Sequence, residues 1–394
     1  MKAVEIAEDV FWVGAIDWNV RNFHGYKTPR GTTYNAYLIT GETNILVDTV
    51  KKPFFDQMVE RIRSVIDPKD IGLIISNHVE MDHSSSLSLA QKMTGAKILA
   101  SKRGVEGLSL HYDDLDVQEV QDGQEIRVGN LTLRFIETPM LHWPDSMFTF
   151  LVERGILFTM DGFGQHLASL KRFDDEVDPS VLDYESAKYY ANILMPFGSQ
   201  FLKTFEKVKG LPIRILATSH GIIWRRDPSK IISRYLSWAN GETKEKAVIA
   251  YDTMWGSTQR MAELIAEGIA SEGIETRLFR ISDSDRSEIM TEVLDARAVV
   301  IGSPTLNNGP FPTVADFMVY LKGLRPRGKI CGLFGSYGWG GGAVKALREQ
   351  AEKAGMIMLD DLEIQYVPKG EKTEKCVNYG KMIGKRIKAN EMKL

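Results

Sequence analysis

Four side chains that can bind a metal ion lie within six residues of the chain: His78, Glu80, Asp82 and His83. They directly follow the apolar run 71–75, which predicts a short buried strand. In an extended loop alternate side chains point the same way, so we expect His78, Glu80 and Asp82 to converge while His83 faces a second ion. The run therefore predicts a metal site at the carboxyl end of a strand, with places for two ions.

Three further positions repeat this design, because each is a potential ligand just beyond a short apolar run: His142, Asp161 and His220. Taken singly, each is more typical of a hydrogen-bonded loop residue, but their joint placement favours a metal site. Four imidazoles and three carboxylates suffice for two ions if one carboxylate bridges them. This oxygen-rich set is typical of a carboxylate-bridged di-iron site rather than of structural zinc.

The composition excludes several other classes of protein. The chain has 394 residues and a net charge of -3, and its lysines and arginines are scattered, so nucleic acid is not expected as a partner. Acids near the N-terminus argue against a signal peptide, and no apolar run approaches the roughly 20 residues of a membrane span. We expect a cytoplasmic protein that binds no membrane. Its two cysteines, Cys331 and Cys376, are too few for a disulfide framework.

The elements that must position these residues change character along the chain. A polar stretch at residues 237–246 marks a boundary, which predicts one domain over 1–245 and a second over 246–394. Before the boundary, short strands such as 33–40, 44–48 and 131–138 mix with a few helices. After it, strands alternate with longer helices, as in a parallel sheet with helices on both faces.

The second domain carries a pattern suited to a phosphate monoester. Strand 247–251 leads into a helix through a loop with three hydroxyls, those of Thr253, Ser257 and Thr258. Hydroxyls and the free amides of a helix N-terminus can hold a phosphate without help from lysine or arginine. The loop has neither a Walker lysine nor spaced dinucleotide glycines, so flavin mononucleotide (FMN) is favoured over an ordinary helix cap.

Two later loops at strand ends, 302–308 and 335–342, should complete the same crevice. Aromatic side chains in these loops can cover a flavin ring, and the glycines let backbone amides approach it. The expected flavin contacts are Thr253, Met254, Trp255, Gly256, Ser257, Thr258, Pro304, Thr305, Leu306, Asn307, Ser336, Tyr337, Gly338, Trp339, Gly340 and Gly341.

The run His-x-Glu-x-Asp-His, with the later histidines and Asp161, resembles the metallo-β-lactamase-like fold in its flavodiiron (A-type flavoprotein) variant. Zinc hydrolases of that fold usually carry a second histidine where Glu80 stands. Residues 31–38, 141–147 and 219–224 are similar to that family as well. The second domain resembles flavodoxin, although Trp255 replaces a common threonine. The resemblance implies an αββα sandwich of α+β type followed by a doubly wound α/β flavodoxin-like sheet.

The resemblance also implies the ligands and the reaction. One iron would be bound by His78, Glu80 and His142, the other by Asp82, His83 and His220, with Asp161 bridging. Reduced FMN would reload a di-iron centre that reduces dioxygen to water or nitric oxide to nitrous oxide. A zinc hydrolase of the same fold and a non-catalytic gas-sensing or electron-transfer module are the alternatives. The preference between the two gases is left open.

Family resemblance further implies a head-to-tail homodimer, and pairing of two dimers into a tetramer stays open. The chain has no four-cysteine iron site, so electrons must come from an external donor such as rubredoxin or a reduced deazaflavin. His24 and Tyr190 are candidate residues of the substrate pocket. His166 could hold a metal ligand in position without binding the metal itself.

Overall fold

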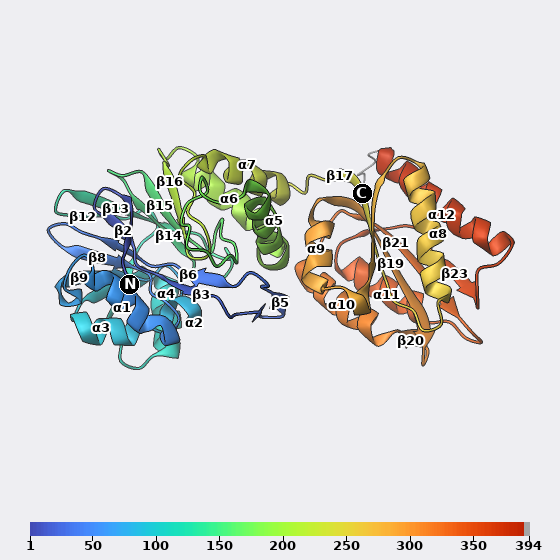
Figure 1. Ribbon diagram of the computed structural model, residues 1–394, viewed down its shortest axis with the longest axis horizontal. Helices are drawn as coiled ribbons and strands as arrows, with labels where there is room; N and C mark the ends of the chain where they lie inside the picture. Colours follow the sequence, from blue (N-terminus) through green and yellow to red (C-terminus); the bar gives the residue numbers. More distant parts are fainter. Residues whose placement is uncertain (390–394) are drawn as a thin grey trace. The chain divides into compact units, whose positions relative to one another are not determined.

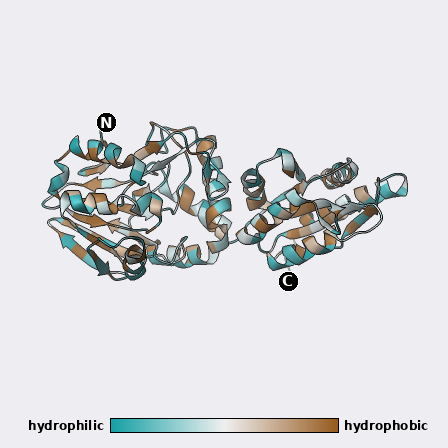
Figure 2. Cartoon of the chain, turned by 90° about the horizontal axis from the view of Figure 1, so that it is seen from below, coloured by the Kyte–Doolittle hydropathy of each residue, from teal (hydrophilic) through white to brown (hydrophobic). Residues whose placement is uncertain are grey.

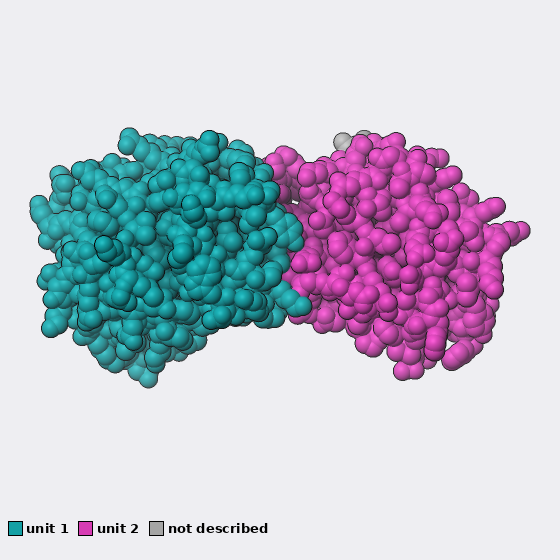
Figure 3. All heavy atoms as spheres, viewed as in Figure 1, with its two compact units in different colours: residues 1–189, 197–236 teal, residues 190–196, 237–394 magenta. Residues whose placement is uncertain are grey.

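The computed structural model describes residues 1–389, which form two compact units. Unit 1 contains residues 1–189 and 197–236, and unit 2 contains residues 190–196 and those from 237 onward (Figure 3). Each unit has its own apolar interior, and hydrophobic residues run along its strands (Figure 2). Within the described residues, no helix is both long and apolar enough to cross a membrane.

Unit 1 is built on two sheets. The first has the strand order β1-β2-β7-β8-β9-β10-β11, and its strands from β8 to β11 run parallel. Its strands are β1 (Val4–Ala7), β2 (Val10–Trp12), β7 (Tyr37–Ile39), β8 (Asn44–Val47), β9 (Ile71–Ile75), β10 (Lys97–Ser101) and β11 (Val117–Val120).

The second sheet of unit 1 has the order β12-β13-β14-β15-β16. Its last pair is parallel and the other pairs are antiparallel. Its strands are β12 (Glu125–Val128), β13 (Leu131–Glu137), β14 (Met147–Leu151), β15 (Ile156–Met160) and β16 (Ile215–Thr218). Val47 of the first sheet and Phe135 and Phe158 of the second belong to one buried core, so the sheets pack face to face.

Helices cover the outer faces of both sheets (Figure 1). On the first sheet lie α1 (Phe55–Arg63), α3 (Leu87–Thr94) and α4 (Lys102–His111), whose buried residues form a second core with the strands. Helices α6 (Gly198–Val208) and α7 (Pro228–Ala239) pack on the second sheet, and α5 (Pro179–Tyr189) precedes them. The αββα sandwich expected from the sequence is thereby confirmed.

The single strand predicted over residues 33–40 is wrong. The structure has two strands there, β6 (Thr32–Tyr34), which pairs with β3 (Ala15–Asp17), and β7. Asn35 interrupts them because its side-chain amide donates to the carbonyls of Thr218 and Gly221 and accepts from the Trp12 indole. The break ties the first strands to the loop after β16. A short hairpin, β4 (Asn22–Phe23) and β5 (Tyr26–Lys27), lies between β3 and β6.

Unit 2 has a parallel sheet in the order β18-β17-β19-β21-β22, and β23 also pairs in parallel with β21. This is the flavodoxin-like strand order. Its strands are β17 (Lys244–Tyr251), β18 (Glu275–Arg280), β19 (Ala296–Leu306), β21 (Ile330–Tyr337), β22 (Ile357–Met358) and β23 (Leu362–Gln365), with β20 (Gly309–Pro310) antiparallel to β19.

Both faces of the unit 2 sheet are covered by helices, as the sequence predicts. Helices α8 (Ser257–Ser271) and α12 (Glu371–Lys388) pack on one face. Helices α9 (Arg286–Asp295), α10 (Pro312–Leu324) and α11 (Ala343–Lys353) pack on the other. The segment 190–196 joins unit 2 through Asn192, which bonds to Ser287 and Tyr320.

Candidate metal centre and flavin crevice

The seven predicted metal donors lie together at the carboxyl ends of strands of unit 1. Within each group, one donor atom from every residue lies within 4.8 Å of the others. The first group is His78, Glu80, His142 and Asp161, and the second is Asp82, His83 and His220. All seven side chains are largely buried, so a bound ion would be shielded from bulk water.

Asp161 lies between the two groups, and each of its carboxylate oxygens faces one of them. Oδ2 is 3.1 Å from Nε2 of His142 and 3.5 Å from Nε2 of His78. Oδ1 is 3.3 Å from Nε2 of His83 and 3.4 Å from Nε2 of His220. One carboxylate can therefore serve both groups.

The donor spacing fits metal ions. Ligand atoms about 2.1 Å from one ion, in tetrahedral or octahedral arrangement, lie about 3.0–3.4 Å from each other. Nε2 of His220 is 3.1 Å from Oδ2 of Asp82, and Nε2 of His142 is 3.4 Å from Oε2 of Glu80. Both carboxylate oxygens of Asp82 and both ring nitrogens of His83 are buried without a hydrogen-bond partner among the described residues. Such atoms are costly unless an ion satisfies them.

Hydrogen bonds on the far side of two imidazoles orient them toward the site. Nδ1 of His78 donates to Oδ2 of Asp145 at 2.9 Å, and Nδ1 of His220 donates to the carbonyl of Thr33 at 2.7 Å. With a proton held on Nδ1 in each ring, Nε2 is the nitrogen that faces the other donors and can bind an ion. Asp145 was missed by the sequence reasoning. The available signal was its position three residues after His142 in a loop stiffened by proline.

The cluster is strongly ionised when it holds no metal. Burial alone would raise the pKa of Asp161, but His83, His142 and His220 hold it well below its usual range. Burial alone would lower the pKa of His83, but the carboxylates of Asp82 and Asp161 raise it to about 9. Because a ligating imidazole must be neutral, an ion that binds here has to displace protons.

The extended-loop prediction is wrong at Asp82. A short helix, α2 (Met81–Ser84), begins directly after Glu80 and carries both Asp82 and His83. The strand-like alternation therefore ends at Glu80, and Asp82 joins the group of His83 and His220 rather than that of His78. The helix turn divides the run between two groups.

The predicted pocket residues have different surroundings. Nε2 of His24 is 3.0 Å from Oε1 of Glu80, and the His24 side chain is about three-quarters exposed. Tyr190 belongs to unit 2, where its ring packs on Trp238 with a centroid distance of 5.1 Å. The preceding tyrosine, Tyr189, lies in unit 1 with its ring centroid 6.2 Å from that of His220.

His166 lies outside both donor groups and packs against His220, with the two ring centroids 4.9 Å apart. Its Nδ1 forms a hydrogen bond of 2.8 Å with Oγ1 of Thr32. Burial, together with the neighbouring His220, lowers the pKa of His166 well below its usual range. His166 is therefore a neutral ring that packs against the predicted ligand His220.

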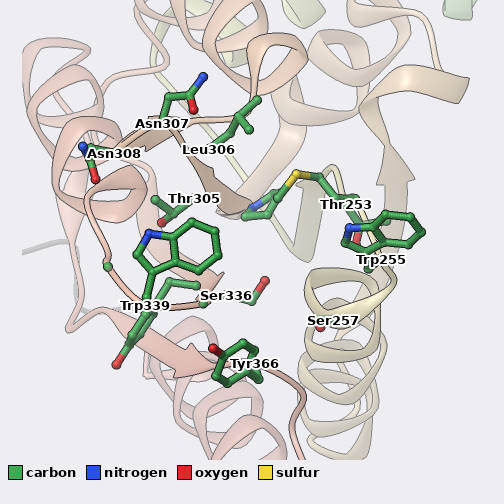
Figure 4. Close-up of a pocket in the computed structure, with 15 residues that line it drawn as sticks. Thr253, Trp255, Ser257, Thr305, Leu306, Asn307, Asn308, Ser336, Trp339 and Tyr366 are labelled. Carbon is green, nitrogen blue, oxygen red and sulfur yellow. The ribbon is translucent and has the colours of Figure 1, made fainter.

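The second site is a crevice of about 500 Å³ at the carboxyl ends of strands β17, β19 and β21 (Figure 4). Of the expected flavin contacts, only Gly256, Thr258 and Gly341 do not line it. Thr258 is fully buried, and its Oγ1 lies 2.9 Å from Oγ of Ser336. Two lining residues were missed, Asn308 and Tyr366. Asn308 adjoins the predicted Asn307, but no sequence signal pointed to Tyr366.

The crevice fits a phosphate and a flat aromatic ring. Oγ1 of Thr253 accepts from the amide of Gly256 at 3.1 Å, which shapes the loop that starts helix α8. That helix N-terminus and the hydroxyls of Thr253 and Ser257 suit an anion. Trp255 and Trp339 stand on opposite sides of the crevice (Figure 4), and both are more than nine-tenths exposed. Their indoles are free to cover the two faces of a bound ring.

The chain matches two described protein families. Residues 32–221 match the family described as ODP family beta lactamase, and residues 249–380 match flavodoxin. Each match falls within one of the two predicted domains.

Relatives match over nearly the whole chain. It is 45% identical to a nitric oxide reductase of Moorella thermoacetica, over 98% of both chains. It is similar in structure to the rubredoxin oxygen:oxidoreductase of Desulfovibrio gigas, with 38% identity, a TM-score of 0.96 and coverage of 98% of this chain and 99% of the other. It is also similar to a flavodiiron protein of Giardia intestinalis, with 36% identity, a TM-score of 0.96 and coverage of 99% and 97%.

Proposed function

The chain belongs to the flavodiiron protein family, and on that premise we propose that it is an oxidoreductase that reduces dioxygen to water, nitric oxide to nitrous oxide, or both. The reaction takes place at a di-iron centre that is reloaded by FMN. A nitric oxide reductase and an oxygen oxidoreductase are both among its relatives, which supports the two gases equally.

The observation that carries the proposal is the placement of Asp161. Its two oxygens face two separate groups of imidazoles at 3.1–3.5 Å, as a bridging carboxylate requires. A site for a single ion would not need donors on both sides of this carboxylate.

We assign the ligands accordingly. His78, Glu80 and His142 would hold one iron, Asp82, His83 and His220 would hold the other, and Asp161 would bridge them. When bound, the iron pair would supply electrons to a small gas, and FMN would supply one or two electrons at a time.

The chain's own residues prepare this site. Asp145 and the carbonyl of Thr33 hold His78 and His220 in the tautomer that turns Nε2 toward the ions. His24 donates toward Glu80 while most of its side chain stays exposed, which supports a place for it at the edge of the substrate pocket. Tyr190 stays a second pocket candidate on the sequence resemblance alone, because the tyrosine whose ring lies near His220 is its neighbour in the chain, Tyr189.

The first test measures the metal and flavin content of the protein. Dioxygen or nitric oxide is then added to an anaerobic solution of the protein and a reduced donor, and its consumption is measured. We expect two irons and one FMN per chain and rapid loss of at least one gas. Zinc in place of iron, with neither gas consumed after reconstitution with iron, would instead support a hydrolase.

We also propose that electrons enter from an external donor and pass between two subunits of a head-to-tail homodimer. The Desulfovibrio gigas relative is named for rubredoxin, which supports a small redox protein as donor, with a reduced deazaflavin as the alternative. Steady-state rates with each donor, at matched concentrations, separate the two.

Mixed dimers test the path between subunits. Asp161→Ala should remove iron from one chain, and Ser257→Glu should repel the flavin phosphate from the other. If electrons cross between subunits, each mixed dimer keeps one working pair of cofactors. A random one-to-one mixture should then recover about a quarter of wild-type activity. No recovery, in dimers shown to have exchanged subunits, would refute the head-to-tail arrangement.

A further inference from the structure

A buried glutamine, Gln165, joins the turn that carries Asp161 to the loop that carries His220. The two segments lie side by side because Asp161 directly follows β15, His220 lies two residues beyond β16, and these strands pair in parallel (Figure 1). Gln165 follows Asp161 by four residues, and its side chain is fully buried. A buried amide must find hydrogen-bond partners inside the protein, so its contacts show what it holds together.

The side-chain amide of Gln165 forms three hydrogen bonds that span both segments. Its Oε1 accepts from the backbone amide of Ile222 at 2.7 Å. Its Nε2 donates to the carbonyl of Phe163 at 3.1 Å and to the carbonyl of Ile222 at 3.2 Å, so both N–H donors are used. Phe163 lies in the turn of the bridging carboxylate, and Ile222 lies two residues after His220. One side chain thus ties the two backbones together.

The backbones of the two segments also approach each other closely. The amide of Gln165 donates to the carbonyl of His220 at 3.3 Å. Gly221 has a φ of +76°, and a β-carbon there would lie 2.1 Å from Oε1 of Gln165. Only glycine combines this backbone conformation with so close a contact, so the loop of His220 lies directly against the amide of Gln165.

These contacts fix the backbone beside two predicted metal ligands. Oδ1 of Asp161 is 3.4 Å from Nε2 of His220, as expected for two ligands of one ion. The side-chain bonds of Gln165 end on backbone groups of neighbouring residues, so Gln165 acts on both ligands through the chain. Ligand atoms must be held within about 0.5 Å of their binding geometry, so a loosened junction would be felt at the ion.

We propose that Gln165 is a positioning residue that fixes the distance between Asp161 and His220 and thereby sets the affinity of the second donor group for iron. The inference rests on the proposed function, because that function assigns both ligands to the second iron. Without the Gln165 amide, the buried N–H of Ile222 loses its acceptor, and the loop must move to find another. The same movement would displace His220 relative to Asp161.

Iron binding by a variant of similar volume tests this role without any turnover. Gln165→Met removes all three side-chain bonds and still fills the space of the glutamine. In an anaerobic titration of the metal-free protein with iron(II) against a chromophoric chelator, we expect one of the two binding steps to weaken about tenfold. Gln165→Glu is a second variant, since its carboxylate keeps the acceptor for Ile222 but cannot donate to the two carbonyls. It should weaken the same step.

Gln91 in α3 provides a matched control, because its side chain forms the same three kinds of hydrogen bond. Its Nε2 donates to the carbonyls of Ala96 at 3.0 Å and Asp116 at 2.9 Å, and its Oε1 accepts from the amide of Asp116 at 2.9 Å. None of these residues belongs to a donor group. Gln91→Met should therefore lower the free energy of unfolding, as Gln165→Met does, but leave both iron-binding steps unchanged.

The outcomes separate the positioning role from the proposed function. Unchanged iron affinity in a folded Gln165→Met protein would overturn the positioning role. Equal weakening of iron binding in the Gln91 and Gln165 variants would point to general destabilisation and would also overturn it. Weakened iron binding in the Gln165 variants alone, in a protein whose wild type consumes neither gas, would support the positioning role and refute the proposed function.

Discussion

The hydrogen bond between Asp145 and His78 yields a quantitative prediction about iron binding. Oδ2 of Asp145 accepts from Nδ1 of His78 at 2.9 Å and from the amide of Val79 at 2.7 Å. One buried oxygen thus orients a predicted ligand and fixes the loop that carries it. Replacing Asp145 with alanine removes both bonds, whereas asparagine keeps an oxygen in the same place but loses the negative charge.

The two substitutions should differ in size of effect. Loss of a partner that orients a metal-bound histidine typically costs 10–100-fold in metal affinity. We expect Asp145→Ala to weaken iron binding about 100-fold, or roughly 2.8 kcal/mol at 1.4 kcal/mol per tenfold. Asp145→Asn should lose about tenfold, because a neutral acceptor forms a weaker bond than a carboxylate.

The assay is an anaerobic titration of the metal-free protein with iron(II) in competition with a chromophoric chelator. Only one of the two binding steps should weaken, because Asp145 contacts His78 and no ligand of the second group. Asp252→Asn is the control, since Asp252 is a buried carboxylate of unit 2 and should leave both steps unchanged. Wild-type affinity in Asp145→Ala would refute the reasoning.

Three further predictions concern protons, flavin and stability. His83, whose pKa in the metal-free protein is about 9, must lose its proton to bind iron, so below pH 9 the iron affinity of its site should rise with pH. A pH-stat titration should record the release of protons on iron binding. Constant iron affinity from pH 6.5 to 8.5 would contradict this prediction. Thr253→Ala removes the acceptor of the Gly256 amide and a hydroxyl of the crevice, so FMN should bind about tenfold more weakly in a fluorescence titration. An unchanged Kd for FMN would count against the assigned phosphate loop. Burial lowers the pKa of Lys329 to about 7, so between pH 7 and about 10.5 the unfolded chain binds the extra proton and stability rises with pH. The unfolding free energy of wild type relative to Lys329→Met should therefore increase by about 2 kcal/mol from pH 7 to 9 in denaturant titrations. A flat difference would refute the shift.

Much of the fold could be predicted from sequence because its signals are local. Apolar runs of four to eight residues marked β9, β13 and β15, and the change from short strands to alternating strands and helices indicated two kinds of architecture. The strand predicted over 33–40 failed because a distant contact, from Asn35 to the loop after β16, overrides the local preference.

Segment 190–196 shows the same limit at the level of domains. Its sequence continues the helix that precedes it, yet it packs in unit 2, where Asn192 bonds to Ser287. A contact across 95 residues of chain has no signature in the local pattern. For the same reason the sequence could not reveal that the tyrosine whose ring lies near His220 is Tyr189.

The sequence by itself determined which donor types stand at the ends of apolar strands, because strand periodicity and residue chemistry are both read locally. The family resemblance already implied how the donors divide into two groups, but only the tertiary structure decided which oxygen of Asp161 faces which group and that Asp145 orients His78. Some of these relations join residues far apart in the chain, such as Asp145 and His78, which are 67 positions apart, and others depend on where a single helical turn begins. They follow from the packing of strands and loops against one another, and no period in the sequence encodes that packing.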